Sequence, residues 1–486
     1  MDRTNWNTLG LILSLGTAAS AQWTLYWAEE FEGSALNLNN WEYQTGTGTA
    51  YGLPAGWGNN ELQYYTNFAD NISVSGGTLK ITARQQNFGG RQYTSARIRT
   101  QGKVDFKWGR VEARMKLPGT TGIWPAFWML PTNSPYGGWA SSGEIDIMES
   151  INQADRIHGT IHFGNNYPNN ASNGGSINTG INYAQGFHDY AIEWEPNQIR
   201  WYLDGQLFHS VNSSQWFSAL GGSNPRAPFD HPFHFLLNVA VGGNWPGDPN
   251  ASSQFPQTLE VDYVRVYRRE QRPFEGQARV IPGLIEAEHY DEGYPGEAYH
   301  DVNAGNTGGA FRDDDVDIQA CSEGGYNIGW IENGEWIEYT VNVAASGTYL
   351  LEARVASLHA GGSFRFEIDA VDSTGPIAVP NTGGWQNWAT VSSQIMLSQG
   401  IQTIRFARID SPNGFNVNWF RFTGLSVPCS PADLAEPYGE LNFFDVSRYL
   451  ALFSSQDPAA DFAEPVGQFD FFDIAAFLSA FSAGCP

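Results

Sequence analysis

The sequence is short of positive charge and of cysteine. Its 486 residues include 26 Lys and Arg against 51 Asp and Glu, a formal net charge of −25. This balance argues against nucleic acid as a partner, because the phosphates would be repelled. Cys429 and Cys485 bracket the C-terminal segment and can pair in an oxidising compartment, which leaves Cys321 over. Spacing alone does not prove the pairing.

Long apolar runs are also lacking. The apolar stretch nearest the N-terminus, residues 9–17, is too short to span a bilayer, and no other segment is a candidate. Arg3 precedes this stretch and Ala19-Ser20-Ala21 follows it. That order is typical of a secretory signal peptide, here residues 1–21. We therefore expect the mature chain to be secreted or attached to a cell surface.

No long amphipathic helical run occurs before the C-terminus. Glycine, tryptophan and tyrosine are abundant instead, with 54, 18 and 21 residues, and charged residues are few. This composition predicts a mainly β protein with many turns. A chain of 486 residues is too long for one hydrophobic core, so two or three domains are expected.

Strand patterns divide the chain after the signal peptide. Residues 22–268 contain alternating strands separated by Gly, Pro and Asn turns, which predicts a sandwich of antiparallel sheets. Residues 269–283 are polar and include Pro273 and Pro282, so they are expected to form a linker. A second β-sandwich is expected over residues 284–424.

The last segment, residues 429–486, contains a duplication. Residues 432–445 recur as residues 460–473, and each copy is followed by a helix-like apolar stretch. A repeated loop and helix predicts a small helical module built from two paired motifs.

Three carboxylates stand in the apolar run of residues 143–150. Because strand side chains alternate, Glu144 and Asp146 share one face. Glu149 has the opposite parity, and a β-bulge near Met148 would return it to that face. No Lys or Arg lies in the run to pair with the acids, so a solvated strand face explains them poorly.

Acids and indoles together favour a sugar ligand. Trp124, Trp128 and Trp139 lie close to the acid run in the sequence, and an aromatic face stacks on the C–H surface of a pyranose. Two carboxyl groups about 5 to 5.5 Å apart are the arrangement of a retaining glycosidase. Asp146 would raise the pKa of one neighbour by repulsion and hydrogen-bond the other, so that similar groups take different roles.

Five motifs, in order, resemble glycoside hydrolase family 16, and most closely its bacterial laminarinases, which are endo-β-1,3-glucanases. They are residues 56–66, 93–99, 124–129, the acid run and residues 229–245. The resemblance implies a jelly-roll sandwich of two curved sheets with a sugar cleft on the concave face. It also implies Glu144 as the nucleophile, Asp146 as the orienting acid and Glu149 as the general acid/base, with no cofactor for catalysis.

The same resemblance implies the residues that contact the substrate. Indoles would border the cleft and polar side chains would bind sugar hydroxyls; the set is Asn59, Glu61, Arg97, Trp124, Trp128, His162, Asn238 and Trp245. Asp262 resembles the family's ligand to a structural Ca²⁺. The extra residue in the acid motif is the laminarinase-like spacing, which favours β-1,3-glucan. Mixed-linkage β-1,3-1,4-glucan or an algal galactan is the alternative with the same mechanism, and a lectin-like binder is the non-catalytic one.

The second sandwich resembles carbohydrate-binding module family 6. The motifs are residues 285–290, 326–330, 334–339, 382–385 and 416–419. The resemblance implies that Tyr326 and Trp385 sandwich a sugar ring and that Asn416 hydrogen-bonds it. It also implies that Glu286 and Glu288 bind a structural Ca²⁺.

The duplicated tail is similar to dockerin-type modules, which use two Ca²⁺ loops. An EF-hand loop needs oxygen ligands at positions 1, 3 and 5 and Gly at position 6. Here Asp433 and Asp461 are followed by Ala435 and Ala463, and the Gly arrives one position late. We therefore expect a disulfide clasp and Phe-rich cores, rather than calcium, to hold a module that docks to a protein or cell-surface partner.

Overall fold

The structure is a computed structural model, which describes residues 23–360, 362–409, 412–425, 429–436 and 438–485. It divides the chain into two compact units, residues 1–270 and 271–486. The expected signal peptide, residues 1–21, lies outside the described residues. Among the helices that are described, none is long and apolar enough to cross a membrane.

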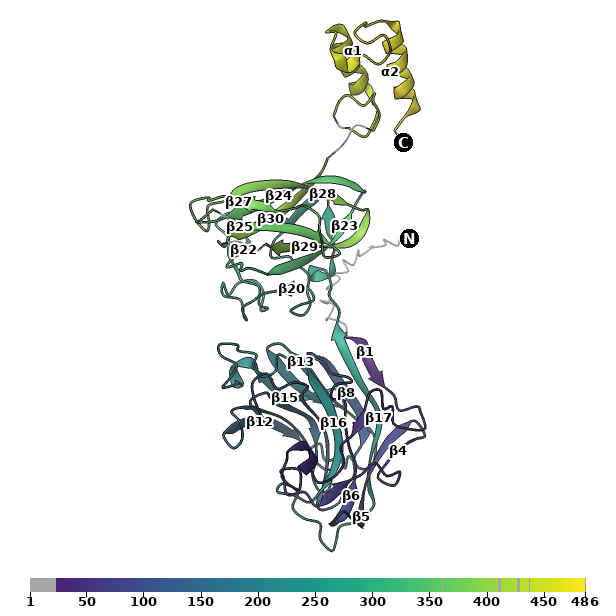
Figure 1. Cartoon of the computed structure of the whole chain (residues 1–486), viewed down its shortest axis with the longest axis vertical. Helices are drawn as coiled ribbons and strands as arrows, with labels where there is room; N and C mark the ends of the chain where they lie inside the picture. Colours follow the sequence, from purple (N-terminus) through teal and green to yellow (C-terminus); the bar gives the residue numbers. More distant parts are fainter. Residues whose placement is uncertain (1–22, 361, 410–411, 426–428, 437, 486) are drawn as a thin grey trace, which may run out of the picture. The chain divides into compact units, whose positions relative to one another are not determined.

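The first unit is a sandwich of two sheets, coloured from purple to teal in Figure 1. Within its described part, the larger sheet has ten strands and is called the β13 sheet. Its strands are β1 (Trp23–Glu29), β3 (Gln63–Tyr65), β4 (Ile72–Ser75), β5 (Thr78–Phe88), β6 (Arg91–Ser95), β8 (Gly109–Lys116), β13 (His188–Glu195), β14 (Gln198–Leu203), β15 (Gln206–Asn212) and β17 (Gln257–Arg269).

The second sheet of this unit is called the β10 sheet. Its seven described strands lie in the order β12-β11-β10-β9-β16-β7-β2. They are β2 (Glu42–Tyr43), β7 (Arg97–Arg99), β9 (Ile123–Pro131), β10 (Glu144–Glu149), β11 (Ile157–Gly164), β12 (Asn170–Ile177) and β16 (Phe233–Val241). The strand that carries the acid run therefore lies inside the sheet, between β9 and β11.

The core of the first unit lies between these two sheets. In β8, Val111, Ala113 and Met115 are buried and alternate with half-buried polar residues. Trp201 of β14 is fully buried, and its indole donates a hydrogen bond of 2.8 Å to the main-chain oxygen of Asp146. The β13 sheet thus supports the back of the strand that carries the acids.

The second unit contains another sandwich, whose described strands form sheets of seven and six. The seven are β18 (Arg279–Ile281), β20 (Tyr299–His300), β23 (Trp336–Val343), β25 (Gly362–Ile368), β26 (Val371–Asp372), β27 (Ile377–Val379) and β29 (Gly400–Arg408). The six are β19 (Gly283–Glu286), β21 (Ile318–Ala320), β22 (Tyr326–Ile328), β24 (Gly347–Ala356), β28 (Ala389–Leu397) and β30 (Asn416–Gly424). Aromatic side chains such as Phe366, Phe406 and Phe420 fill its core.

The expected linker, residues 269–283, is largely structured. Arg269 ends β17, and Arg279–Ile281 form β18, which pairs in parallel with β23. Phe274 stacks on His289 with ring centroids 4.7 Å apart. The second sandwich therefore begins before residue 284. The sequence did not show this, because a three-residue strand is too short to have an alternating pattern.

The tail contains the two α-helices of the described chain, α1 (Phe443–Ser454) and α2 (Phe471–Ala483). Each begins with a capping box, from Asn442 in the first copy and Asp470 in the second. Short 3-10 helices occur elsewhere in the chain: η1 (Thr49–Tyr51), η2 (Ser213–Gln215), η3 (Phe274–Gly276) and η4 (Pro458–Ala460). The predicted fold class is confirmed: two β-sandwiches followed by a small helical module.

The tail has a core of its own. Tyr449 of α1 stacks on Phe477 of α2 at 3.9 Å, and these residues occupy equivalent positions in the two copies. Cys429 and Cys485 form a disulfide, as the sequence suggested, and Cys321 is free. The two repeated motifs thus pack against each other with their outer ends joined covalently.

Candidate active site

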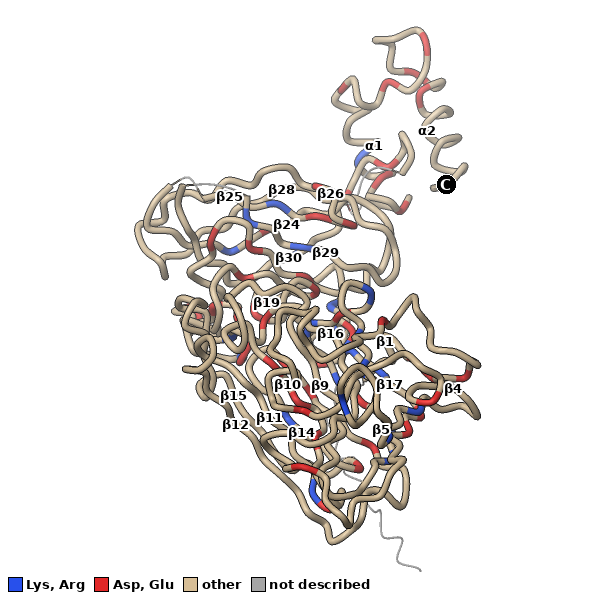
Figure 2. Tube along the Cα trace, turned by 60° about the horizontal axis from the view of Figure 1, so that its bottom comes forward, with Lys and Arg blue, Asp and Glu red and all other residues tan. Residues whose placement is uncertain are grey.

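A β-bulge in β10 brings the acids to one face. The register against β9 shifts between Asp146 and Met148, and the register against β11 shifts between Asp146 and Glu149. The apolar residues of the strand are buried, whereas Glu144 and Glu149 are only half-buried. Acidic positions along β10 are red in Figure 2. This is the bulge that the broken parity of the sequence predicted.

His162 supplies the positive charge that the acid run lacks. It lies opposite Glu144 on the neighbouring strand β11. Its Nε2 is 3.4 Å from Asp146 Oδ2 and 3.8 Å from Glu144 Oε1. Burial alone would lower the pKa of His162, but Asp146, with help from the two glutamates, raises it to about 9. The residue predicted to bind a hydroxyl is therefore an imidazolium held against two of the acids at neutral pH.

The two glutamates occupy unlike electrostatic environments. Burial, and then the charge of Asp146, raise the pKa of Glu144 to about 8 and raise that of Glu149 well above its usual value. His162 and Arg97 oppose the rise at Glu144 through their positive charges. Repulsion from Glu144 adds to the rise at Glu149. His162 opposes the rise at both glutamates, so the positive charge of Arg97 at Glu144 and the repulsion felt by Glu149 are what favour Glu149 as the general acid.

Each glutamate also accepts a hydrogen bond from one indole. Trp139 Nε1 donates to Glu144 Oε2 at 2.8 Å, and Trp124 Nε1 donates to Glu149 Oε1 at 2.9 Å. Trp124 is on β9, whereas Trp139 lies in the loop that connects β9 to β10. Trp124 was predicted to border the sugar. The contact of Trp139 was missed, although its closeness to the acid run in the sequence was a usable signal.

Trp245 continues the wall that Trp124 begins. The two rings meet edge to face at 5.4 Å, and His158 contacts Trp245 on its other side at 4.9 Å. Trp245 is 40% exposed, so a ligand can still reach it. This placement agrees with the expectation that Trp245 extends the cleft.

Arg97 and Trp128 form a packed part of the same surface. The Arg97 guanidinium lies 4.4 Å from the Trp57 ring and 4.8 Å from the Trp128 ring. Its Nε donates to Gln44 Oε1 at 2.6 Å. Trp128 Nε1 donates to Asn238 Oδ1 at 2.8 Å. These contacts fix the side chains of Arg97 and Trp128. They also occupy polar groups of Arg97, Trp128 and Asn238 that were expected to contact sugar.

Glu61 is likewise occupied. It accepts hydrogen bonds from Gln63 at 2.6 Å, from Tyr65 at 3.3 Å and from Asn59 at 3.5 Å. Burial raises its pKa. Tyr65 also accepts a hydrogen bond of 3.2 Å from Asn238 Nδ2, so Asn59, Glu61 and Asn238 belong to one network beside Trp128. The structure brings these predicted residues together.

Asp262 does not join a cluster of acids. Its Oδ2 lies 3.4 Å from Arg114 Nε, and its side chain is 43% exposed. An arginine partner neutralises the charge that a Ca²⁺ ligand would contribute. The calcium role expected for Asp262 therefore stays a prediction, with Arg114 as a competitor for one oxygen of the carboxylate. The sequence showed the strand but not this cross-strand arginine.

The binding module has a cavity of about 720 Å³. Trp385 and Asn416 line it, as expected, and Asn416 Nδ2 donates to the main-chain oxygen of Trp385 at 2.7 Å. Tyr326 does not line the cavity, and its ring packs on Phe311 at 4.9 Å. Trp330, four residues later in the same motif and 48% exposed, lines the cavity instead.

Glu288 is a buried carboxylate with one unused oxygen. The residue is 3% exposed, and its Oε2 has no hydrogen-bond partner in the described structure. Burial, with the charge of Glu286 adding to it, raises its pKa to about 7. An orphaned carboxylate oxygen beside a second glutamate fits a hard cation.

The tail loops are closed by aspartates that accept main-chain hydrogen bonds. Asp445 accepts from Leu434 and Ala435 at 2.8 and 2.9 Å, and from Asn442 at 2.8 Å. Asp473 repeats this pattern in the second copy, with Phe462, Ala463 and Asp470 as donors. The N–H groups point at the carboxylate and close each loop, while Asp433 Oδ1 and Asp461 Oδ1 are buried without a partner in the described structure. That calcium does not hold these loops stays a prediction.

Comparison with known proteins identifies both β-sandwiches. Residues 59–265 match the family described as glycosyl hydrolases family 16, and residues 310–424 match carbohydrate binding module family 6. The chain is 45% identical over 278 residues to glucan endo-1,3-beta-glucosidase A1 of Niallia circulans, a match that covers 53% of this chain and 40% of that protein. The predicted binding module and the predicted enzyme class are thereby confirmed.

Two further relatives match the first unit along most of their own length. The chain is 44% identical over 261 residues to the beta-glucanase of Rhodothermus marinus, covering 51% of this chain and 85% of that one. The X-ray structure of endo-beta-1,3-glucanase from Pyrococcus furiosus is 42% identical, with a TM-score of 0.46, and is matched over 51% of this chain and 95% of that chain. With the acid cluster of β10 and the family match in the same unit, the chain belongs to family 16 of the glycosyl hydrolases.

Proposed function

We propose that the protein is a retaining endo-β-1,3-glucanase that hydrolyses laminarin-type glucans. The observation that carries this proposal is the pair Glu144 and Glu149, which a bulge turns to one face and which differ in their charged neighbours. Two carboxyl groups with different affinities for a proton are what retaining hydrolysis of a glycosidic bond needs.

In this mechanism Glu144 attacks the anomeric carbon while Glu149 gives its proton to the departing glycosidic oxygen. The glycosyl-enzyme ester is then attacked by water, from which Glu149 takes a proton, and the anomeric configuration is retained. The imidazolium of His162, close to Asp146 and Glu144, stabilises the carboxylate before attack and when it is released. These side chains carry out the chemistry without a cofactor.

The preference for β-1,3-glucan is supported by two features. The acid motif has the laminarinase-like spacing, and relatives of the first unit carry the names endo-1,3-beta-glucanase and glucan endo-1,3-beta-glucosidase. Mixed-linkage glucan or an algal galactan is the alternative substrate for the same mechanism. A sulfated galactan would need basic contacts, which a chain with 26 Lys and Arg against 51 Asp and Glu offers sparingly.

Hydrolysis assays on laminarin test the proposal. Reducing ends should appear with the wild-type protein and should be lost in Glu144→Gln and in Glu149→Gln. Proton NMR at early times should show the β-anomer as the first product. Release of the α-anomer first, or substantial activity in either variant, would contradict the assigned roles. A panel with mixed-linkage glucan and agarose identifies the preferred polymer, and binding without hydrolysis of any of them would favour a lectin-like protein.

We further propose that the sandwich of the second unit binds glucan in the cavity lined by Trp330 and Trp385. Two exposed indoles on one cavity supply stacking faces, and Asn416 supplies a hydrogen-bonding amide. Trp330→Ala should weaken retention of the full chain on insoluble β-1,3-glucan by at least about tenfold, the scale of loss of a buried aromatic anchor. Tyr326→Phe is the matched control, because Tyr326 packs on Phe311 away from the cavity. Equal losses in both would contradict this placement.

A structural Ca²⁺ held by Glu286 and Glu288 is part of the same proposal, supported by the unused oxygen of Glu288. The ion would neutralise two neighbouring carboxylates and fasten the end of β19, without a part in catalysis.

The tail is proposed to attach a secreted enzyme to a protein or cell-surface partner, in the manner of a dockerin-type module. Support comes from large apolar side chains that are exposed at equivalent positions of both copies. Phe443 and Phe471 are 76% and 73% exposed, and Phe444 and Phe472 are 62% and 64% exposed. Arg448 is the one basic residue of this module, and most of its charged positions are red in Figure 2. A Phe443→Ser and Phe471→Ser double variant should release the enzyme from the cell-surface fraction while hydrolysis of laminarin is unchanged.

A further inference from the structure

The two catalytic carboxyl groups have matching indole donors from different parts of the chain. Trp139 Nε1 lies 2.8 Å from Glu144 Oε2, and Trp124 Nε1 lies 2.9 Å from Glu149 Oε1. An N–H donor stabilises a carboxylate more than the protonated acid, because hydrogen bonds to ionised groups are the stronger ones. Each indole therefore acts on the protonation of a different member of the pair.

The loop that carries Trp139 is held in place by its own contacts. The hydroxyl of Ser142 accepts from the Tyr136 main-chain N–H at 3.0 Å and donates to the Gly137 oxygen at 2.8 Å. The Trp139 main-chain oxygen accepts from the N–H of Tyr167 at 2.8 Å, which joins the loop to the segment after β11. The loop that presents the indole to Glu144 is thus held by the Ser142 hydroxyl and by a main-chain bond to Tyr167, neither of which involves the substrate.

The other charged groups around Glu144 come from three strands. Asp146 is on the same strand and disfavours the ionised form, whereas His162 of β11 and Arg97 of β7 favour it. Asp146 acts in the same direction on Glu149 and so does not distinguish the two glutamates strongly. Each indole, by contrast, donates to a single glutamate in the described structure, so removing one indole perturbs one glutamate directly.

We propose that Trp139 is a positioning residue that orients the nucleophile Glu144 and favours its ionised form, and that Trp124 orients the acid/base Glu149 and weakens its hold on the proton that it donates. This inference rests on the proposed function, since it takes the roles of the two glutamates from it. The consequence is that the two indoles control opposite limbs of the pH profile of hydrolysis. Trp139 acts on the acidic limb, which follows ionisation of the nucleophile, and Trp124 acts on the basic limb, which follows loss of the acid proton.

The sign of each shift follows from which form the indole stabilises. Without the Trp139 donor, the pKa of Glu144 rises, so a higher pH is needed before the nucleophile is ionised and the acidic limb moves to higher pH. Without the Trp124 donor, the pKa of Glu149 also rises, so the acid keeps its proton longer and the basic limb moves to higher pH. Loss of one hydrogen bond to a charged group corresponds to a shift of about one pH unit.

The experiment measures kcat/KM on laminarin across the pH range for the full chain and for Trp139→Phe and Trp124→Phe. Phenylalanine keeps an aromatic ring and removes the N–H in both. Trp139→Phe should narrow the profile from its acidic side, and Trp124→Phe should extend it on its basic side. Thermal unfolding of each variant checks that it is folded, and Trp139→Leu, which removes the donor without leaving a ring, must move the same limb as Trp139→Phe.

Three results separate the possible outcomes. A uniform loss of kcat/KM at every pH in Trp139→Phe and Trp139→Leu would overturn the inference, because Trp139 would then be a sugar platform or a loop support. Movement of the same limb by Trp139→Phe and Trp124→Phe would also overturn it. If instead Glu144→Gln hydrolyses laminarin, the proposed function itself fails, and that result does not depend on either indole.

Discussion

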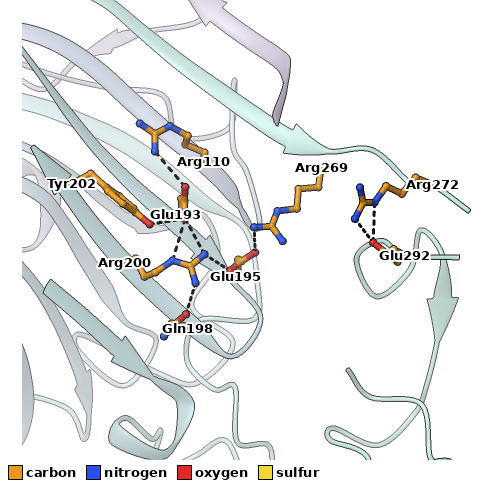
Figure 3. Close-up of polar contacts among 9 residues, drawn as sticks. All are labelled: Arg110, Glu193, Glu195, Gln198, Arg200, Tyr202, Arg269, Arg272 and Glu292. Carbon is orange, nitrogen blue, oxygen red and sulfur yellow. Dashed lines mark hydrogen bonds and ion pairs between the residues drawn. The ribbon is translucent and has the colours of Figure 1, made fainter. Parts of the chain in front are cut away.

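The acids of β10 and those of β13 look alike in the sequence and have opposite surroundings. Glu193 and Glu195 flank a tryptophan in β13, as Glu144 and Asp146 flank an isoleucine in β10. Figure 3 shows Glu193 and Glu195 in contact with arginines from neighbouring strands. In β10 the neighbours are indoles and a histidine. Cross-strand partners, rather than the strand's own pattern, therefore decide whether a pair of acids is structural or reactive.

The arginine contacts of β13 lower the proton affinity of Glu193. Arg200 lies 2.8 Å from Glu193 Oε2, and Tyr202 OH donates to the same oxygen at 2.8 Å. Arg110 adds a contact of 3.4 Å to the other oxygen. Burial works against ionisation here too, but the Tyr202 and Arg200 hydrogen bonds outweigh it and lower the pKa of Glu193. The same burial raises the pKa of both glutamates of β10, because in the described structure indoles, and not arginines, are hydrogen-bonded to them.

The largest predicted effect compares activity in Glu144→Gln and Glu193→Gln. Removal of the nucleophile should reduce kcat on laminarin by more than about a thousandfold, because the covalent route is lost. Glu193→Gln replaces an acid of equal size on the other sheet and should leave kcat within about twofold, the range expected away from the reacting atoms. Comparable losses in the two variants, measured as initial rates of reducing-sugar release, would mean that β10 holds no nucleophile.

A second prediction concerns Glu288, a buried acid that has no assigned role in catalysis. If Glu288 awaits a cation, calcium should raise the midpoint of thermal unfolding of the second unit by about 5 °C at concentrations far above its dissociation constant. Glu288→Gln should abolish that response to calcium and to EDTA. Asp262→Asn is the matched control, because Asp262 already has Arg114 as a partner. A calcium response that survives in Glu288→Gln would place the ion elsewhere.

Much of the first unit could be predicted from local pattern. Alternation of apolar and polar residues predicted the sandwiches, and the odd spacing of Glu149 from Glu144 predicted the bulge. Both features are visible in consecutive residues. The pairing of Cys429 with Cys485, which the sequence left open, is present in the structure. The family resemblance implied Glu144 as nucleophile, a role that stays a prediction, and the structure adds its neighbours Trp139, His162 and Asp146.

The parts that were not predicted depend on where loops and neighbouring strands lie. The motif with Tyr326 and Trp330 offered two aromatic residues, and only the fold shows that Trp330, just after β22, lines the cavity. Trp139 reaches Glu144 through a loop whose path is set by contacts with a distant segment. The pairing of Asp262 with Arg114 joins β17 to β8, which no local window of sequence contains.

A third prediction uses stability, and the two acids should differ in sign. Glu144 has a pKa of about 8 in the fold, so at neutral pH folding favours a proton on a carboxyl group that is ionised in the unfolded chain, and this destabilises the folded state. Glu144→Gln should therefore raise the unfolding midpoint at neutral pH by about 2 °C, and the gain should vanish in acid, where the carboxyl group is protonated in both states. Glu193 has a lowered pKa in the fold, so it stabilises the folded state at pH values above the pKa that it has in the unfolded chain. Glu193→Gln should lower the midpoint at neutral pH, and that loss should vanish as the pH falls.

Thermal unfolding of the full chain, with the midpoint of the first unit measured at neutral and at acidic pH, tests this difference in sign. Glu193 keeps its role only if the two variants shift the midpoint in opposite directions at neutral pH. A gain of stability in both variants would show that the arginine contacts of β13 stabilise the fold by less than burial of Glu193 destabilises it.

The smallest predicted effect extends the comparison to carboxylates whose partners are main-chain N–H groups. Burial works against ionisation of Asp445, but its hydrogen bonds with Asn442, Ala435 and Leu434 outweigh this and lower its pKa. Its stabilising effect is therefore present above the unfolded pKa and is lost as the pH falls through the folded value. Because the loop is closed by these bonds, EDTA should leave amide hydrogen exchange over residues 432–445 of the full chain unchanged. Asp445→Asn should speed that exchange, and a chelator effect in the wild type would instead identify a cation in the loop.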